Sequence, residues 1–279
     1  MIKKLLFCFI AILLFSEARA EESFNISTAL MRSTFKIQED NKVGTVFILG
    51  QPVPDDASRA AYTLFTAAHV LNGMKNDNVT IFLRKKEKDT FIKFPIQLKI
   101  RSNGKPLWIE HPEVDIAVMR MSIPHAADLK IISTEMIAND DFLNKFEVNP
   151  GDDLLVLGFP YGTESNEAGF PILRSGRIAN YPLTPTKTTK TFMLDFEIFG
   201  GNSGGPVFMR SRNRTYGGST HIGTVRQLMG IVSQEKIIIE TVKTIGQEVK
   251  KKHKLSIAVI VHASFLKELL LMLSPYENK

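Results

Sequence analysis

Cysteine is almost absent from this chain of 279 residues, because Cys8 is its only representative. Cys8 lies within the first twenty residues, so the chain that remains after loss of this segment contains no cysteine. The sequence therefore excludes a fold that depends on a framework of disulfide bonds.

Long hydrophobic runs are also missing. The apolar stretch from Leu5 to Phe15 is too short for a comfortable membrane span. Lys3 and Lys4 precede it, and the small-residue motif Ala18-Arg19-Ala20 follows it. This order is typical of a secretory signal peptide with cleavage after Ala20. An uncleaved N-terminal anchor is the alternative interpretation.

A strong excess of one charge is lacking as well. The chain has 35 Lys and Arg against 29 Asp and Glu, a formal net charge of +6, which becomes 32 − 28 = +4 without residues 1–20. Such a mild excess favours a role in solubility over a polyanion-binding role. We expect no nucleic-acid partner, and the sequence shows no internal repeat or low-complexity segment.

Glycine, in contrast, is concentrated around one serine. In the stretch Gly200–Phe208, Ser203 has two glycines on each side, with Asn202 in between on the N-terminal side. Glycine tolerates positive φ and allows close approach to the main chain. Such a turn can present the Ser203 hydroxyl beside the N–H groups of Gly201 and Ser203, as a nucleophile beside an oxyanion hole. An ordinary glycine-rich hairpin turn is the alternative.

Two further blocks precede this turn. His69 ends the run Tyr62-Thr63-Leu64-Phe65-Thr66-Ala67-Ala68-His69, and Asp115 opens the run Asp115-Ile116-Ala117-Val118-Met119. In the order His, Asp, Ser, the three blocks resemble the motifs of chymotrypsin-like serine proteases. The closest resemblance is to HtrA-type and other disulfide-free trypsin-like peptidases of bacteria, and it extends roughly from Val43 to Leu270. The motifs are specific jointly and weak singly.

The resemblance implies an all-β fold of two six-stranded antiparallel β-barrels followed by a C-terminal helix. No PDZ-like domain is expected after it, because too few residues remain. The expected segments are a signal peptide at 1–20 and a protease domain at 21–279, with barrels at about 33–125 and 148–262 and the helix at about 263–273. Secreted eukaryotic relatives usually carry disulfide bonds, so a cysteine-free exported chain fits the bacterial periplasm or secretion better.

The resemblance also assigns roles. Ser203 is expected to be the nucleophile, His69 its base and Asp115 the group that orients the imidazole, with Gly201 and Ser203 as oxyanion donors. No metal or cofactor is implied. Rival acids are Glu113, Asp152 and Asp153, which lack a following apolar strand. The other histidines are expected to be surface or structural residues; they are His111, His125, His221, His253 and His262.

Substrate preference stays open. Glu197 stands six residues before Ser203, where an acid would favour Arg or Lys at the cleavage site. A shift of one residue would instead place Ile198 in the pocket and favour small apolar residues, so we expect an apolar or mixed pocket. Asn202 replaces the aspartate that captures a freed N-terminus in digestive enzymes of this class, so activation by such an ion pair is not expected.

Two other segments receive simple interpretations. The charged run Arg84–Asp89 is expected to form a solvated hairpin tip. Ile237–Lys252 fits either a helix or an extended hairpin.

The expected function is exported serine endopeptidase activity on protein or peptide substrates, without stable membrane insertion after signal cleavage. The alternatives are a protease-fold protein that binds peptides without cutting them, and an esterase-like hydrolase. The oligomeric state is not predicted.

Overall fold

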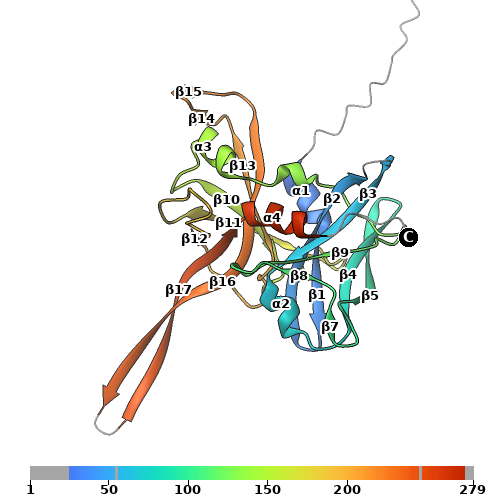
Figure 1. Ribbon diagram of the computed structural model, residues 1–279, viewed down its shortest axis with the longest axis horizontal. Coiled ribbons are helices and arrows are strands. Elements are labelled where there is room, and N and C mark those ends of the chain that lie inside the picture. Colours follow the sequence, from blue (N-terminus) through green and yellow to red (C-terminus); the bar gives the residue numbers. More distant parts are fainter. Residues whose placement is uncertain (1–24, 54–55, 245–246, 274–279) are drawn as a thin grey trace, which may run out of the picture.

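The computed structural model describes residues 25–53, 56–244 and 247–273. The predicted signal peptide lies outside these residues. Two β-rich halves lie side by side, and helix α4 (Ser264–Met272) lies between them (Figure 1). This helix is the one expected near the C-terminus. Among the described residues, no helix combines the length and apolar character needed to cross a membrane.

The N-terminal half is a seven-stranded antiparallel sheet in the order β5-β4-β1-β2-β3-β9-β8. Its strands are β1 (Thr34–Glu39), β2 (Lys42–Val53), β3 (Asp56–Thr66), β4 (Asn78–Glu87), β5 (Thr90–Lys99), β8 (Ile109–Glu110) and β9 (Ala117–Arg120). Within the described ranges this order does not close on itself, so the expected second closed barrel is not confirmed. Strand β8 has only two residues, which limits how far this edge can pair.

The C-terminal half is a closed barrel in the order β10-β11-β12-β17-β16-β13. This confirms the predicted six-stranded barrel in this half. Its strands are β10 (Asp153–Gly158), β11 (Ile172–Ile178), β12 (Thr191–Asp195), β13 (Pro206–Arg212), β16 (Thr224–Thr244) and β17 (Gln247–His262). Closure pairs every strand on both sides and thereby removes the unpaired edges of an open sheet.

The remaining elements are short. The other helices are α1 (Ile26–Ser33), α2 (Ala68–Gly73), η1 (Thr134–Met136), α3 (Asp140–Lys145) and η2 (Pro160–Gly162). Two small hairpins complete the secondary structure of the described residues; they consist of β6 (Arg101–Ser102) with β7 (Lys105–Pro106), and β14 (Thr215–Tyr216) with β15 (Ser219–Thr220). Asn25 caps α1 by accepting hydrogen bonds from the N–H groups of Ser27 and Thr28.

Two hydrophobic clusters form the interior. One lies within the N-terminal sheet, where alternate residues such as Phe35 and Ile37 of β1 are buried. The other fills the barrel and continues to the N-terminal half, because Phe47 and Phe65 belong to it. The two phenyl rings stack with centroids 5.4 Å apart. This second cluster therefore crosses the boundary between the halves, which is where the candidate site lies.

The segment around 237–252 is an extended hairpin and not a helix. Residues 237–244 of β16 pair with residues 247–254 of β17, and the two strands leave the barrel as a long ribbon (Figure 1). Apolar residues in this segment fit helical spacing, but the same strands are already paired inside the barrel. Continuing that ladder requires no new nucleation, which favours the strand.

The charged run Arg84–Asp89, which begins within β4, is only partly solvated. Residues 86–89 are exposed at the β4–β5 turn, but the Arg84 side chain is fully buried, so its assignment to a solvated tip was wrong. The Arg84 guanidinium donates to the carbonyls of Met31, Thr34 and Gly169, as well as that of Arg32. It therefore connects the N-terminal segment to a loop of the barrel half. Burial lowers its pKa to about 9, although Asp128 opposes this shift.

Candidate active site

His69 is positioned by the end of strand β3. The strand ends at Thr66, whose hydroxyl donates to the Thr45 carbonyl at 2.7 Å, and helix α2 places His69 in its first turn. Because Thr66 pairs with Ala117 of β9, Asp115 comes next to His69. The His69 ring Nδ1 lies 2.7 Å from Asp115 Oδ2, and its backbone N–H donates to Oδ1 at 3.0 Å. The register of β3 with β9 therefore places His69 and Asp115 next to each other.

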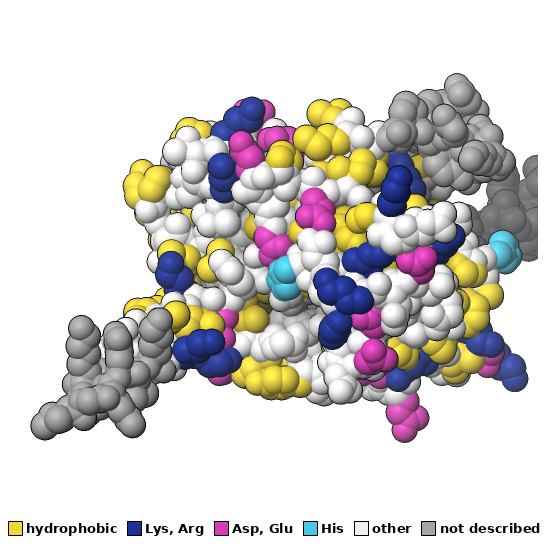
Figure 2. Space-filling model, turned by 60° about the horizontal axis from the view of Figure 1, so that its bottom comes forward, with side chains coloured by type: hydrophobic (Ala, Val, Ile, Leu, Met, Phe, Trp, Pro, Cys, Tyr) yellow, Lys and Arg dark blue, Asp and Glu magenta, His cyan; other side chains and the backbone are white. Residues whose placement is uncertain are grey.

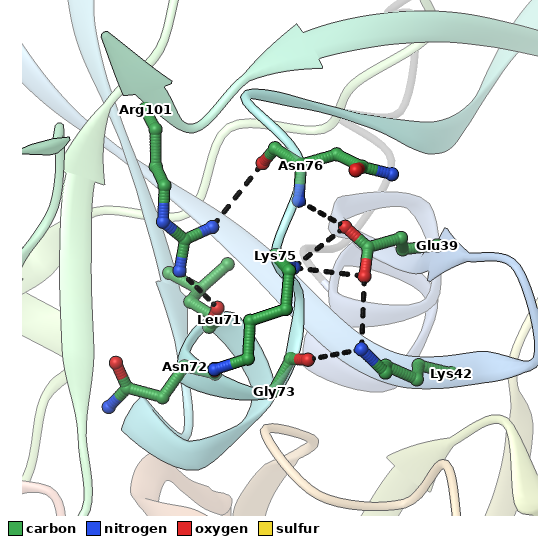
Figure 3. Close-up of polar contacts among 8 residues, drawn as sticks. All are labelled: Glu39, Lys42, Leu71, Asn72, Gly73, Lys75, Asn76 and Arg101. Atoms are coloured by element: carbon green, nitrogen blue, oxygen red, sulfur yellow. Dashed lines mark hydrogen bonds and ion pairs between the residues drawn. The ribbon is translucent and has the colours of Figure 1, made fainter. Parts of the chain in front are cut away.

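A cluster of charged groups fixes the segment that follows His69 (Figure 3). The buried Glu39 carboxylate accepts hydrogen bonds from the backbone N–H groups of Lys75 and Asn76 and from Lys42 Nζ. Burial alone would raise the pKa of Glu39, but these hydrogen bonds outweigh it and lower the pKa. Arg101 donates to the Leu71 carbonyl at the end of α2 at 3.2 Å. Helix α2 is therefore attached at its C-terminal side by side-chain charges.

Asp115 has a second hydrogen-bond donor from the barrel half. Ser233 of β16 donates its hydroxyl to Asp115 Oδ2 at 2.5 Å. Burial opposes ionisation of Asp115, but the hydrogen bonds from His69 and Ser233 dominate and lower its pKa. The carboxylate is thus held ionised, which suits a group that orients an imidazole and stabilises its protonated form.

The glycine-rich stretch forms a tight turn before Ser203. The Asn202 N–H donates to the Phe199 carbonyl at 3.1 Å, and Gly201 has φ of +97°. A Cβ atom on Gly201 would lie 2.2 Å from the Phe159 carbonyl oxygen, so only glycine fits there. The Gly200 carbonyl accepts from the Tyr161 N–H at 2.6 Å and so has a partner within the chain.

The turn is anchored to the N-terminal half by Thr45 of strand β2, through its backbone and its hydroxyl. Thr45 N–H donates to the Ser203 carbonyl at 2.9 Å, and the Thr45 hydroxyl donates to the Gly201 carbonyl at 2.6 Å. Gly204, with φ of +86°, approaches Thr45 so closely that a Cβ atom would lie 2.1 Å from its carbonyl oxygen. These contacts set the position of Ser203 relative to β2, which pairs with the strand that leads to His69.

The predicted oxyanion donors are free to serve a ligand. Across residues 25–53, 56–244 and 247–273, neither the Gly201 nor the Ser203 N–H has a hydrogen-bond acceptor. Both groups lie in a turn whose carbonyls are occupied, those of Gly201 and Ser203 by Thr45 and that of Gly200 by Tyr161. An arrangement of this kind suits a developing negative charge on a substrate oxygen.

Ser203 itself faces Ser233. Its hydroxyl donates to the Ser233 carbonyl at 3.1 Å, whereas the Ser233 hydroxyl donates to Asp115. In the described part of the chain no hydrogen bond joins Ser203 to His69. The structure thus brings His69, Asp115 and Ser203 together around Ser233, with the Ser203 hydroxyl turned to the carbonyl of that residue.

The rival acids lie in other ion pairs. Glu113 pairs with Lys190, Asp152 with Arg214 and Asp153 with Arg177.

Of the two predicted pocket residues, Glu197 is exposed and Ile198 is packed in the core. Within the described residues neither has a contact that assigns it to a substrate pocket, and both stay predictions.

The other histidines are also engaged elsewhere or lie on the surface. His111 contacts Glu268, His253 contacts Glu240, and His221 stacks on Tyr216. His262 is buried in the barrel against Phe192, and His125 is exposed.

Sequence reasoning did not find Ser233, Thr45 or Glu39. Ser233 stands in β16, the barrel strand that pairs with β13 after the nucleophile turn, 30 residues from Ser203. Thr45 and Glu39 act on residues more than 30 positions away, through a carbonyl and through backbone N–H groups. Such contacts leave no local pattern in the sequence.

Comparison with known proteins identifies the family of this chain. The family model of the trypsin-like peptidase domain matches residues 44–217, more than half of the chain, and this range includes His69, Asp115 and Ser203. No curated protein sequence matches the chain. Among solved structures the chain is similar to Rv3671c from M. tuberculosis H37Rv, crystallised as a serine-to-alanine mutant in an inactive form. The two are 17% identical with a TM-score of 0.47, over 91% of this chain and 92% of that one. A similarity at this level assigns no activity to the present chain.

Proposed function

Because this chain belongs to the family of trypsin-like peptidase domains, we propose that it is a serine endopeptidase that acts through an acyl-enzyme intermediate. The family supports a hydrolase that acts on proteins. The assignment of Ser203, His69 and Asp115 as its catalytic residues is our proposal. The observation that supports it best is the His69–Asp115 contact at 2.7 Å beside a serine turn with two unused N–H groups.

The proposed reaction begins with a rotation of the Ser203 side chain. Its hydroxyl leaves the Ser233 carbonyl and turns toward His69 Nε2, which removes the proton as Ser203 Oγ attacks the substrate carbonyl carbon. Asp115 keeps Nδ1–H directed at itself and stabilises the imidazolium that results. The Gly201 and Ser203 N–H groups bind the oxyanion of the tetrahedral intermediate.

The intermediate then collapses to an acyl-enzyme. The bond to the leaving amine breaks, and His69 donates its proton to that nitrogen. A water molecule next loses a proton to His69, attacks the acyl carbon and releases the carboxylic acid, and the proton returns to Ser203. The residues that carry out each step all belong to this chain. The lowered pKa of Asp115 keeps its carboxylate ionised, so that it orients His69 as the base at any pH above the range in which Asp115 takes up a proton.

The proposal is tested by covalent labelling with a fluorophosphonate, which reacts with activated serines. The purified chain is compared with Ser203→Ala and His69→Ala variants, and the fold of each is checked by circular dichroism. We expect labelling of the wild type alone. Equal labelling of wild type and Ser203→Ala would assign the reaction to another residue and reject the proposal.

A second candidate is a protease-fold protein that binds extended peptides without cutting them. One observation favours it: the Ser203 hydroxyl donates to the Ser233 carbonyl and not to His69. If this orientation persists, the serine is not activated. A folded wild type that binds peptides but resists labelling, even at high reagent concentration, would support this candidate over the first.

The proposal extends to the substrate pocket and to the location of the protein. We infer an apolar or mixed pocket beside Ser203, in which Ile198 contributes to the wall. If Glu197 instead selected basic residues, Glu197→Gln would lower cleavage after Arg and Lys but not after Leu.

We further propose bacterial export to the periplasm or medium, after cleavage behind Ala20, which mass spectrometry of the exported chain tests.

A further inference from the structure

The ribbon that leaves the barrel has two free edges. Strand β13 pairs with β16 only as far as Ile231, and β12 pairs with β17 only from Ile257 onward. Backbone hydrogen bonds also join Val232 to Gly204 and Gly205, and Ser256 to Phe196. After Ser233 on β16 and before Ser256 on β17, the two strands pair only with each other in the described part of the chain. A two-stranded ribbon is marginally stable by itself, and an unpaired edge is a template for another strand.

The two edges differ in character. On β16, Ile237, Ile238 and Ile239 follow one another and are 43%, 49% and 57% exposed. On the facing part of β17, residues 251–254 are Lys, Lys, His and Lys, and all are exposed. Figure 2 shows hydrophobic and basic side chains side by side where the ribbon leaves the body. Lysines on an edge discourage strand pairing, whereas an apolar edge favours it, so β16 is the edge suited to a partner.

The sequence of this edge is complementary to itself. In an antiparallel pair related by a two-fold axis, one residue lies opposite its own copy. With Ile238 at that position, Lys236 lies opposite Glu240 of the second copy and Glu240 opposite Lys236. Ile237 likewise lies opposite Ile239 on both sides. We propose that two copies of this chain pair antiparallel through their β16 edges, centred on Ile238, to form a four-stranded ribbon.

Charge and apolar contact together select this register. Opposite charges directly across from each other stabilise a sheet, and like charges destabilise it. Centring the pair on Ile237 or on Ile239 would place Lys236 or Glu240 opposite Ile238 and lose both ion pairs. Lys236 forms no ion pair in the described residues, and Glu240 contacts His253 at 2.9 Å on the exposed surface, so both charges remain available.

Such a dimer leaves the candidate active site intact. Ile238 is five residues along β16 from Ser233, a separation of roughly 17 Å in an extended strand. Neither Lys236 nor Glu240 contacts His69, Asp115 or Ser203. The inference therefore stands apart from the proposed function, and labelling of Ser203 in each variant shows separately whether the site is active.

The first test is analytical ultracentrifugation of the full chain over a hundredfold range of concentration. We expect a reversible dimer in the wild type. Lys236→Glu places like charges opposite each other twice, and so does Glu240→Lys, so each single variant should weaken the dimer roughly tenfold. The variant that carries both exchanges should dimerise like the wild type. Lys252→Glu, on the other strand and opposite Ile239, is the matched control and should have little effect.

Mixing the two single variants gives the sharpest outcome. In a pair made of one Lys236→Glu chain and one Glu240→Lys chain, both cross-strand charge pairs are again opposite. An equimolar mixture should therefore form a heterodimer, although neither variant associates well alone. A partner of another kind would not produce this recovery.

Cross-linking provides a second measurement of the same register. Directly opposite residues of antiparallel strands have Cα atoms about 4.5–5.5 Å apart, which is within the range of a disulfide bond. In a chain carrying Cys8→Ser, mild oxidation should cross-link Ile238→Cys to its own copy, and Lys252→Cys should not react. A chain that stays monomeric throughout, or a dimer indifferent to the charge exchanges, would overturn the proposal. So would a monomer whose ribbon binds anionic lipid vesicles or another protein instead.

Discussion

The two halves of the molecule hold their parts of the candidate site by different means. The N-terminal half fixes His69 through side-chain charges, with Asp115 on the ring and Glu39 on the loop after α2. The C-terminal half fixes Ser203 through backbone hydrogen bonds and through glycines that have no room for a side chain. Carboxylates take up protons in acid and backbone groups do not. The two attachments should therefore respond differently to mutation and to pH.

The largest effect is expected from a side chain added to the backbone-held turn. In Gly204→Ala the new Cβ would lie about 2 Å from Thr45 and Thr66 oxygens, at a φ of +86°. We expect a loss of roughly 4 kcal/mol in the free energy of unfolding and no labelling of Ser203. Urea denaturation and fluorophosphonate labelling measure both.

The matched glycine of the N-terminal half is Gly73 in α2, whose Cβ would meet nothing within 4 Å. Gly73→Ala should change stability by less than about 0.5 kcal/mol. If both variants behave alike, the turn is more adaptable than its contacts indicate, and the contrast between the halves fails.

The next effect concerns the link between the halves. Arg84→Met removes the guanidinium and leaves the buried carbonyls of Met31, Thr34 and Gly169 without a donor. We expect a loss of about 3 kcal/mol, since each unsatisfied buried group costs free energy. Lys86→Met, two residues along the same strand and exposed, is the control. Equal stabilities in urea would mean that Arg84 connects nothing of consequence.

A third effect concerns His262, a buried histidine of the barrel that is not part of the candidate site. Burial lowers the pKa of His262 to about 4, against about 6.5 in an unfolded chain. The unfolded state therefore binds more protons between these values, and stability should fall by roughly 2–3 kcal/mol as pH drops from about 6.5 to 4. His262→Phe should abolish this slope in a pH series of urea denaturations. A slope that persists in the variant would have to come from another group.

The smallest effect tests the charged attachment of α2. Glu39→Gln keeps one acceptor oxygen but loses the charge, and we expect a loss of about 1–2 kcal/mol at neutral pH. Because the pKa of Glu39 is lowered in the folded chain, its contribution is present above about pH 4.3 and is lost as pH falls further. The wild type should approach the variant in acid.

The labelling rate of Ser203 in Glu39→Gln, measured at neutral pH, gives a second reading. If the cluster positions His69, the rate should fall while the fold is retained. Gln97→Glu, at an exposed position of β5, offers a comparison for a charge change on the same half. An unchanged rate would limit Glu39 to a role in stability.

Local sequence was sufficient for much of this protein. The glycine-rich stretch predicted a tight turn at Ser203, and the order of three motifs predicted the trypsin-like family, which the family model confirms. These features depend on neighbours within a few residues, so a single sequence contains them. The placement of His69 next to Asp115 followed from the resemblance, and the register of β3 with β9 supplies its physical basis.

Only the tertiary structure decided the rest. Arg84 belongs by sequence to a charged run, yet four carbonyls from distant segments and two aromatic rings enclose it. The ribbon after Ser233 fitted two structures until strand pairing selected one, and the orientation of the Ser203 hydroxyl depends on a carbonyl 30 residues away. Contacts between residues far apart in the chain decide these features, because the free energy of burial and hydrogen bonding is realised only after the halves pack together.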